Sequence, residues 1–339
     1  MVALADVARS AGVSEATASR ALNRPEMVRR EVVTRVREAA ERLGYVPNPF
    51  ARSLRVQDSK TLGLIIPDST NPFFAEVAKG IEAACFEAGY TLILGNSDRS
   101  LEKEAAQARV LYEKRVDGVL LFNTNDASAP TMRWLLDRSL PVILVERRSP
   151  GPPVDAVLSD NRAAVHDAIQ HLVDLGHRRV GFVVGDVTAS HYAERLAAYR
   201  EALGNHGLPR RDDLVRTGMV SYEDGQRATE ALVGLPEPPT AILCATDTLA
   251  IGALRGILAS GRKVPDDVAV IGYGDTEISA YTTPPLTTVG QQKEVVGSTA
   301  VQVLLARIGS NREEPAPSRT LLVPTRLVVR ESTVGRERR

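Results

Sequence analysis

Residues 4–23 read LADVARSAGVSEATASRALN, and this stretch decides the kind of domain with which the chain begins. Val7, Ala8 and Ala11 recur at the spacing of a single helix face. Gly12 follows them and suits a tight turn, because a residue without a Cβ atom accepts positive φ. After the turn, a second short segment with helical spacing begins. Two short helices joined by a glycine-containing turn indicate a helix-turn-helix.

The residues that follow complete a small helical domain. Ser14 is a good N-cap for the second helix, and Ala18 and Leu22 lie four residues apart on the side expected to face the core. A third helix is predicted from about Arg30 to Leu43, and it ends at Gly44, a typical residue beyond a helix C-terminus. This pattern by itself is also compatible with a three-helix bundle that has no role in DNA binding.

The second helix offers side chains suited to reading DNA. In a helix-turn-helix, the N-terminal residues of this helix reach base edges in the major groove. Arg20 can bind a guanine with its planar fork, and Glu15 can accept a hydrogen bond from a cytosine amine. The hydroxyl and amide side chains are better suited to phosphates or to helix caps. The DNA-binding residues expected in the head are Ser14, Glu15, Ala16, Thr17, Ser19, Arg20 and Asn23.

The charge of the chain is divided unevenly along its length. Overall, 42 Lys and Arg balance 42 Asp and Glu, so the formal net charge is zero. The first 60 residues hold eleven of the basic residues and seven of the acidic ones, which leaves the remainder acidic. A small basic head on a mildly acidic body fits local binding to phosphates. An excess of this size is also compatible with chance.

Composition and motifs argue against several other classes of protein. The N-terminal residues lack the apolar core of a signal peptide and no stretch has the length of a membrane span, so we expect a cytoplasmic protein without a membrane partner. Cys85 and Cys244 each lie in an apolar stretch and are expected to be buried free thiols. The sequence contains no P-loop, nucleophile elbow, zinc pattern or dinucleotide-binding glycine motif. We therefore expect no enzymatic activity, no catalytic residues, no metal and no cofactor.

A short segment with two prolines, within residues 47–60, follows the head. Pro49 can occupy the first turn of a helix without losing a hydrogen bond. A helix of six or seven residues is unstable alone in water, because nucleation is unfavourable, so it would need a partner. A passive linker is the alternative interpretation of this segment.

From Thr61 onward, continuous apolar strands alternate with helical stretches, which is typical of parallel sheets covered by helices on both faces. The predicted strands are Leu62–Pro67, Thr91–Gly95, Gly118–Phe122, Val142–Val145, Ala156–Leu158, Val180–Val184, Leu214–Met219, Ala241–Cys244 and Val268–Gly272. The predicted helices are Phe74–Ala88, Glu102–Lys114, Arg162–Leu175, Glu194–His206, Tyr222–Leu232 and Thr248–Leu258. Two such sets of strands predict an α/β body of two doubly wound parallel-sheet subdomains.

Ligands of doubly wound folds bind at the carboxyl ends of the strands, so a cleft between two facing halves is the expected pocket. Arg195 is the leading candidate, because a buried arginine there requires an anionic or hydroxyl-rich partner. Its alternative role is a structural bridge to Glu146 or Asp160. Phe73 can stack on a sugar or a base or pack in the core, and Asp247 can bind ligand or cap the helix at 248–258.

Several motifs together carry a resemblance to a known family. They are Gly12-Val13-Ser14, Thr17, Ser19-Arg20, Leu22-Asn23, Gly44-Tyr45-Val46-Pro47-Asn48 and Ala51-Arg52-Ser53-Leu54. These motifs resemble the head and hinge of the LacI/GalR family of transcriptional regulators, and the resemblance continues over nearly the whole chain. It implies a small all-α helix-turn-helix head and a periplasmic-binding-protein-like body. The expected domains are a DNA-binding domain at 1–46, a hinge helix and linker at 47–60, and an effector-binding and dimerisation domain at 61–332.

The resemblance also implies a function and its partners. We expect a sequence-specific DNA-binding regulator, typically a repressor, that binds a pseudo-palindromic double-stranded operator as a homodimer. Two hinge helices would pack together in the minor groove, with Leu54 as the wedge at the central base step and Ala51 and Arg55 beside it. A small-molecule effector, favoured to be a sugar or a sugar derivative, would bind between an N-subdomain of about 61–160 plus 291–320 and a C-subdomain of about 161–290 plus 321–332. The effector-binding residues expected are Phe73, Phe74, Glu146, Asp160, His191, Arg195, Val220, Thr246, Asp247 and Asp275.

The chain departs from the family pattern at four positions. Ala3 replaces the usual threonine cap of the first helix and Ala18 replaces a valine, which predicts a head of low stability in the absence of DNA. Gly274 stands where many sugar-binding members have an aspartate, and Val220 where an aromatic residue often lies. The effector therefore remains open, and a corepressor-dependent regulator that senses a nucleobase or another metabolite is the alternative. A solute-binding protein or an enzyme is a less favoured alternative of a different class.

Overall fold

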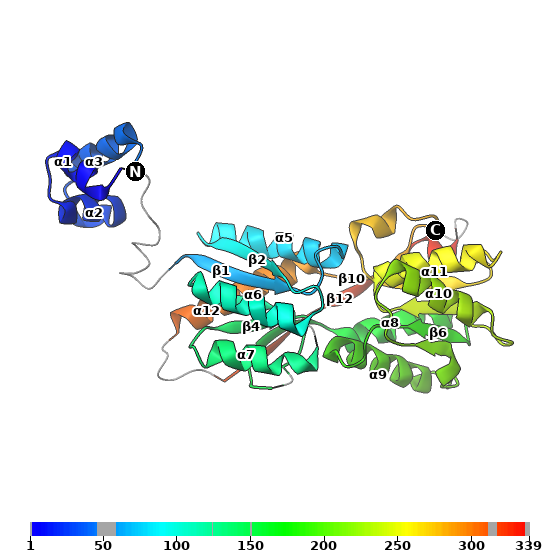
Figure 1. Ribbon diagram of the computed structural model, residues 1–339. Coiled ribbons are helices and arrows are strands. Elements are labelled where there is room, and N and C mark those ends of the chain that lie inside the picture. The colour runs from blue at the N-terminus through cyan, green and yellow to red at the C-terminus, as the bar shows by residue number, and fades with distance from the viewer. Residues whose placement is uncertain (1, 46–58, 124, 150, 311–316, 336–339) are drawn as a thin grey trace. The chain divides into compact units, whose positions relative to one another are not determined.

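The computed structural model describes residues 2–45, 59–123, 125–149, 151–310 and 317–335. The chain divides into two units, a head at Met1–Ser59 and a body at Lys60–Arg339. The regular structure of the described head residues is all helical, and the body contains two six-stranded sheets with helices around them (Figure 1). These observations confirm the predicted fold class.

The described head contains α1 (Leu4–Ala11), α2 (Glu15–Asn23), the 3-10 turn η1 (Pro25–Met27) and α3 (Arg30–Leu43). The turn residues Gly12 and Gly44 have φ values of 65° and 64°, as the sequence predicted for both. The core is built largely from alanine and valine, with Ala18 and Val36 fully buried. Leu22, expected in the core, is only partly buried, because Ala21 takes the central position on α2.

The N-terminus of α1 lacks a side-chain cap. The backbone N–H of Ala3 donates to Asp6 Oδ2 at 3.0 Å, but no side chain at position 3 accepts from the helix in return. Half of a capping box is therefore present.

We expect Ala3→Ser to stabilise the head by about 1 kcal/mol, because a serine hydroxyl at the N-cap can accept a backbone N–H of the first turn of α1, which no side chain accepts now. Amide hydrogen exchange of α1 in the full-length protein should then be about fivefold slower than in the wild type. Ala3→Val, which adds bulk without an acceptor, is the control and should not slow exchange. Equal protection in both variants would contradict the capping explanation.

The first sheet of the body has the order β11-β5-β4-β3-β1-β2, and all of its described pairs are parallel. Its strands are β1 (Thr61–Ile66), β2 (Thr91–Asn96), β3 (Gly118–Leu121), β4 (Val142–Val145), β5 (Asp155–Ser159) and β11 (Thr320–Val323). The helices around it are α5 (Pro72–Glu87), α6 (Leu101–Glu113), α7 (Ala129–Leu136) and α12 (Lys293–Gly309), with the short η2 (Asp126–Ser128) before α7 (Figure 1). We call this half the first lobe.

The second sheet has the order β12-β10-β9-β8-β6-β7, with β12 antiparallel to β10. Its strands are β6 (Val180–Val183), β7 (Val215–Arg216), β8 (Ala241–Cys244), β9 (Ala269–Gly274), β10 (Thr287–Gln291) and β12 (Thr325–Val328). The helical segments of this second lobe are α8 (Asn161–Asp174), α9 (Ser190–Asn205), η3 (Asp212–Leu214), α10 (Tyr222–Val233), α11 (Asp247–Ala259), η4 (Glu277–Ala280) and α13 (Glu331–Val334). The strand predicted at Leu214–Met219 is wrong in length, because η3 occupies its start and only two residues pair.

Apolar side chains cover both faces of each sheet, which explains the continuous apolar runs in the sequence. In β1, Leu62, Leu64 and Ile66 pack into one cluster with α5 and α12, while Ile65 packs into another with α6 and α7. Cys85 and Cys244 are buried free thiols, as expected, and burial raises the pKa of Cys85 to about 11.

The chain passes between the lobes three times. It leaves the first lobe after β5 at Asp160, returns after β10 at Gln292, and crosses once more at Pro324 between β11 and β12. Each lobe is therefore assembled from separate segments of the chain. Among the described residues, no helix has the length and apolarity that crossing a bilayer requires.

Candidate functional site

The recognition-helix candidate α2 is held by its own side chains. Ser14 Oγ accepts the backbone N–H of Thr17 at 3.2 Å and lies 2.9 Å from the hydroxyl of Thr17. Asn23 Nδ2 donates to the carbonyl of Ser19 at 2.9 Å. Four of the residues expected at the DNA interface therefore also stabilise the two ends of the helix.

The remaining three expected residues, Glu15, Ala16 and Arg20, are exposed. Within the described head, the side chains of Glu15 and Arg20 make no hydrogen bond or ion pair with another residue. Because Arg20 has no intramolecular hydrogen bond to give up, its guanidinium is available to a base edge. The other expected DNA contacts, Ala51, Leu54 and Arg55, lie outside the described residues.

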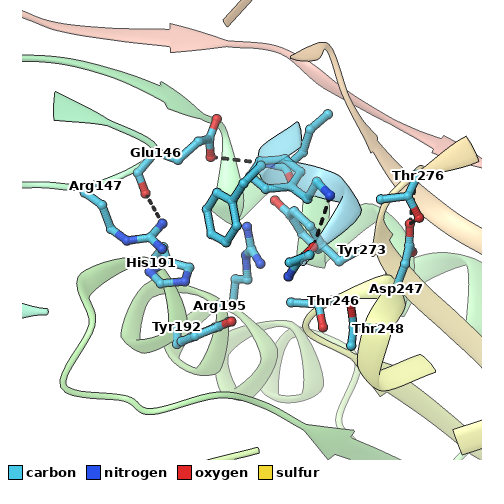
Figure 2. Close-up of a pocket in the computed structure, with 14 residues that line it drawn as sticks. Glu146, Arg147, His191, Tyr192, Arg195, Thr246, Asp247, Thr248, Tyr273 and Thr276 are labelled. Atoms are coloured by element: carbon cyan, nitrogen blue, oxygen red, sulfur yellow. Dashed lines mark hydrogen bonds between the residues drawn. The ribbon is translucent and has the colours of Figure 1, made fainter. Parts of the chain in front are cut away.

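A pocket lies in the body where the two lobes meet (Figure 2). Seven of the ten residues that we expected to bind an effector line it. Its free volume is about 30 Å³, which accommodates a few water molecules but not a sugar or a nucleobase. The lining residues are Asn71, Phe73, Phe74, Glu146, Arg147, His191, Tyr192, Arg195, Thr246, Asp247, Thr248, Tyr273, Thr276 and Gln291.

Contacts on two sides hold the lobes together around the pocket. On one side, the backbone N–H of Arg148 donates to Ser190 Oγ at 3.1 Å, and the Arg148 side chain pairs with Glu194. On the other side, Glu76 accepts the backbone N–H of Glu277 at 3.1 Å, and Lys293 Nζ donates to the carbonyl of Gly274 at 2.8 Å. A ligand can therefore enter only when the lobes separate or when lining side chains move.

Glu146 is a buried carboxylate whose hydrogen-bonding capacity is used within the protein. Its Oε1 accepts the backbone N–H and the hydroxyl of Ser159 at 3.0 and 2.7 Å, and its Oε2 accepts Gln291 Nε2 at 2.9 Å. Burial raises the pKa of Glu146, although the hydrogen bonds from Ser159 and the nearby Arg195 oppose the shift. Glu146 therefore joins strand ends of both sheets.

Asp247 is also saturated. Its Oδ2 accepts the backbone N–H and hydroxyl of Thr276 and the hydroxyl of Ser279, and its Oδ1 accepts the hydroxyl of Thr288 at 2.5 Å. The expectation that Asp247 caps the helix is wrong, because Thr246 is the N-cap and its hydroxyl accepts the N–H of Leu249 at 3.2 Å. Asp247 instead ties the start of α11 to β10 and to the loop after β9.

Arg195, on α9, is buried at the edge of the pocket. Its Nε donates to Asn161 Oδ1 at 2.9 Å and its Nη1 to the carbonyl of Ala245 at 2.7 Å. The guanidinium carbon lies 3.5 Å from the centroid of the Tyr273 ring. Among the described residues, Arg195 makes no hydrogen bond to Glu146 or Asp160. The ion pair that the sequence suggested as an alternative is therefore absent there, and Arg195 contacts neutral groups instead.

Arg147 and His191 are the least satisfied buried side chains of the pocket. Arg147 Nη1 donates to the carbonyl of Glu146 at 2.8 Å, but its Nε is buried without a partner among the described residues. The same holds for His191 Nδ1. Burial lowers the pKa of Arg147 to about 10, and burial together with Arg147 and Arg195 places the pKa of His191 well below its ordinary value.

Sequence reasoning missed Arg147, although its position directly after β4 is the strand-end signal that selected Glu146. It also missed Tyr192, Thr248, Tyr273, Thr276 and Gln291. Tyr273 and Gln291 lie inside strands, and only the pairing of the strands brings them to the cleft. Asn71 carried the strand-end signal, but it was not among the residues selected for the site.

Three expected effector residues do not line the pocket. Asp160 caps α8 by accepting the N–H of Ala163 at 3.0 Å. Asp275 pairs with Arg330 at 2.7 Å. Its carboxylate therefore does not replace the aspartate that many sugar-binding members have at the position of Gly274. Val220 lies in the loop before α10, where its N–H donates to Asp224.

Comparison with known proteins gives matches to both units. Residues 3–48 match the family described as bacterial regulatory proteins, lacI family, and residues 169–333 match a periplasmic binding protein-like domain. The HTH-type transcriptional repressor PurR of Erwinia tasmaniensis is 36% identical over 333 residues, which cover 98% of this chain and 97% of that protein. Its namesake in Aliivibrio salmonicida is 34% identical over 314 residues, covering 93% and 94%.

The solved structures that resemble this chain over its full length include a complex with DNA and complexes with small molecules. The lac repressor dimer bound to operator and the anti-inducer ONPF has 28% identity and a TM-score of 0.88, covering 98% of this chain and 99% of its own. The complex of the transcriptional regulator CelR with cellobiose has 32% identity and a TM-score of 0.75, covering 98% and 100%.

Proposed function

The chain belongs to the lacI family of bacterial regulatory proteins. From this premise we propose how it represses transcription: α2 reads operator DNA, and a small molecule bound between the lobes controls the affinity for that DNA. The observation that carries this proposal is the exposed face of α2. There Arg20 and Glu15 have no partner within the described head, while Ser14, Thr17, Ser19 and Asn23 hold the helix in shape.

We assign residues 1–46 to DNA reading, 47–60 to the hinge and 61–332 to effector binding and dimerisation. In the hinge, Leu54 would insert between base pairs, with Ala51 and Arg55 at the groove. The three crossings between the lobes support a hinge motion of the body, because each crossing segment is short. A change in the angle between the lobes would then order or separate the two hinge segments of a dimer.

For the effector we retain the expected residues that line the pocket, above all Phe73, His191 and Arg195. Phe74 packs edge-on against Phe122 with 5.3 Å between ring centroids, so it serves as the floor of the pocket. The relatives bind different molecules: the CelR structure holds cellobiose and the lac repressor structure holds ONPF. We favour a sugar derivative, with a nucleobase or another metabolite that acts as a corepressor as the alternative.

Exposed apolar side chains of the body support a dimer. Phe86 and Tyr281 are each 78% exposed, and Leu258 is 67% exposed. Phe86 lies near the end of α5, Leu258 near the end of α11, and Tyr281 just after η4. The hydrogen bond from the backbone N–H of Glu277 to Glu76 connects η4 to α5. Exposed apolar side chains mark an interaction surface where they form a contiguous patch, and the proposed dimer requires this of these three. We propose that a second copy of the chain covers them, which aligns two heads with two half-sites of DNA in the cytoplasm.

The test is selection of bound sequences from a random duplex library by the full-length protein. A pseudo-palindrome with a flexible central step is expected, because two heads and two hinges would read it together. Failure of every metabolite-supplemented selection to enrich a sequence would contradict the proposed function.

On the selected operator, Arg20→Ala should weaken binding by about 1–3 kcal/mol and relax the preference at one position of each half-site. Fluorescence anisotropy with matched and mutated operators measures both effects. The control is Arg37→Ala, which removes the same charge from the exposed side of α3 and should weaken binding to all sequences alike. If the two variants lose the same amount on every sequence, Arg20 reads phosphates rather than bases.

A further inference from the structure

The acidic and basic side chains of the cleft pocket differ in how fully they are paired within the protein. Its two carboxylates, Glu146 and Asp247, accept hydrogen bonds from partners within the protein at both of their oxygens. Its two arginines, Arg147 and Arg195, are 6% and 4% exposed, and the hydrogen bonds recorded for them go to neutral oxygens. The basic groups are therefore the ones that remain available to a ligand.

Two buried nitrogen atoms of this pocket have no partner in the described part of the protein. They are Arg147 Nε and His191 Nδ1, on side chains that are each 6% exposed. Buried polar atoms of native proteins are nearly always hydrogen-bonded, so two orphans in one pocket require an explanation. Figure 2 shows Arg147 beside His191, with Arg195 next along the pocket.

Helix N-termini add positive potential at the same place. Residues at the starts of α5, α9 and α11 all line the pocket. The cap residue of α9, Ala189, offers no side-chain acceptor, and His191 lies in the first turn of that helix. Unpaired N–H groups of a first turn and the helix dipole both favour an anion.

Resting on the proposed function, we infer that the effector of this protein carries a phosphate or carboxylate group, and that Arg147 and His191 bind this group while Arg195 contacts the adjoining part of the molecule. The anion supplies an acceptor for Arg147 Nε, and for His191 Nδ1 in the tautomer that carries the proton on Nδ1. It also neutralises the charge of arginines that are buried away from water. The remainder of the effector packs against the partly buried ring of Phe73, which meets Phe74 edge-on at 5.4 Å.

A site of this kind has a consequence for stability when it is empty. Arg195 is close enough to disfavour the charge of Arg147, and the nearby Arg99 has the same effect on Arg147 although it pairs with Asp68. Removing the charge of Arg147 is therefore expected to leave the unliganded protein at least as stable as the wild type. A purely structural arginine would give a loss of stability instead.

The experiment compares thermal unfolding of the full-length wild type and Arg147→Gln in inorganic phosphate, acetate and chloride at equal ionic strength. Phosphate stabilises many proteins nonspecifically, so the measured quantity is the difference between the two proteins. Arg109→Gln, at an exposed position of α6, is the matched control. We expect apparent phosphate or acetate binding to be about tenfold weaker in Arg147→Gln, unchanged in Arg109→Gln, and partly recovered in Arg147→Lys.

The anion that gives the larger difference between the wild type and Arg147→Gln identifies the group as a phosphate or a carboxylate. If neither anion distinguishes Arg147→Gln from the wild type, or if Arg109→Gln loses as much, the anion site is overturned. Operator binding is measured on the same preparations, so the two proposals can fail separately. Intact operator binding without a difference in anion response removes only this inference, whereas loss of operator binding in the wild type removes the proposed function.

Discussion

Asp247→Ala is expected to lower the free energy of unfolding of the body by about 3–5 kcal/mol, the range found when one partner of a buried charged network is removed. The substitution leaves four buried donors without their acceptor: the backbone N–H and hydroxyl of Thr276, and the hydroxyls of Ser279 and Thr288. These donors belong to β10, η4 and the loop after β9, so the whole edge of the second lobe would loosen.

Chemical denaturation of the full-length protein, followed by circular dichroism, measures this loss. Asp275→Ala is the control, since Asp275 also follows a strand but holds a single partly exposed ion pair with Arg330. We expect it to cost about 1 kcal/mol or less. If Asp247→Ala unfolded like the wild type yet abolished the effector response, Asp247 would be a ligand contact rather than a structural residue.

The second large effect is expected for Gly252→Ala, where α10 and α11 cross closely. A Cβ atom at position 252 would lie 2.0 Å from the carbonyl oxygen of Tyr222 and 2.9 Å from the backbone nitrogen of Gln226. Backbone atoms cannot rotate away as side chains do, so the helices would have to separate. Overpacking of this kind costs about 3 kcal/mol, at the upper end of the usual range.

Thermal unfolding of Gly252→Ala and of Gly309→Ala separates this effect from a change in helix propensity. Gly309 ends α12, and a Cβ atom there would meet no atom of another described segment within 4 Å. Gly309→Ala should therefore be neutral or slightly stabilising. Similar midpoints for the two variants would show that the helix crossing adapts without loss of stability.

The elements with strong local signals could be predicted from the sequence. Gly12 and Gly44 end α1 and α3 as expected, and Ser14 caps α2, because each signal depends on the conformation of a few neighbouring residues. Strands β4 and β8 match the predicted ranges residue for residue. The short strands β11 and β12 have no comparable signal and were not predicted.

The candidate site was predicted less completely than the fold. Strand ends located the cleft and seven of its lining residues, since the carboxyl ends of parallel strands meet at one edge of a sheet. Arg147 followed the same rule and was overlooked. Gln291 was out of reach because it is the last residue of β10, a strand that was not predicted, and Tyr273 lies inside β9, where its residue type does not indicate a pocket.

The sequence by itself determined the helix-turn-helix head, the two parallel-sheet lobes and the polar strand ends that surround the cleft, because these follow from local conformational preferences and from the period of apolar residues. Only the tertiary structure decided which charges of the cleft are satisfied. Gln291, 145 residues from Glu146, and Thr288, 41 residues from Asp247, saturate the two carboxylates. Within the described residues, Arg147 Nε and His191 Nδ1 are buried without a partner, because burial of both side chains depends on packing between segments that are distant in the chain.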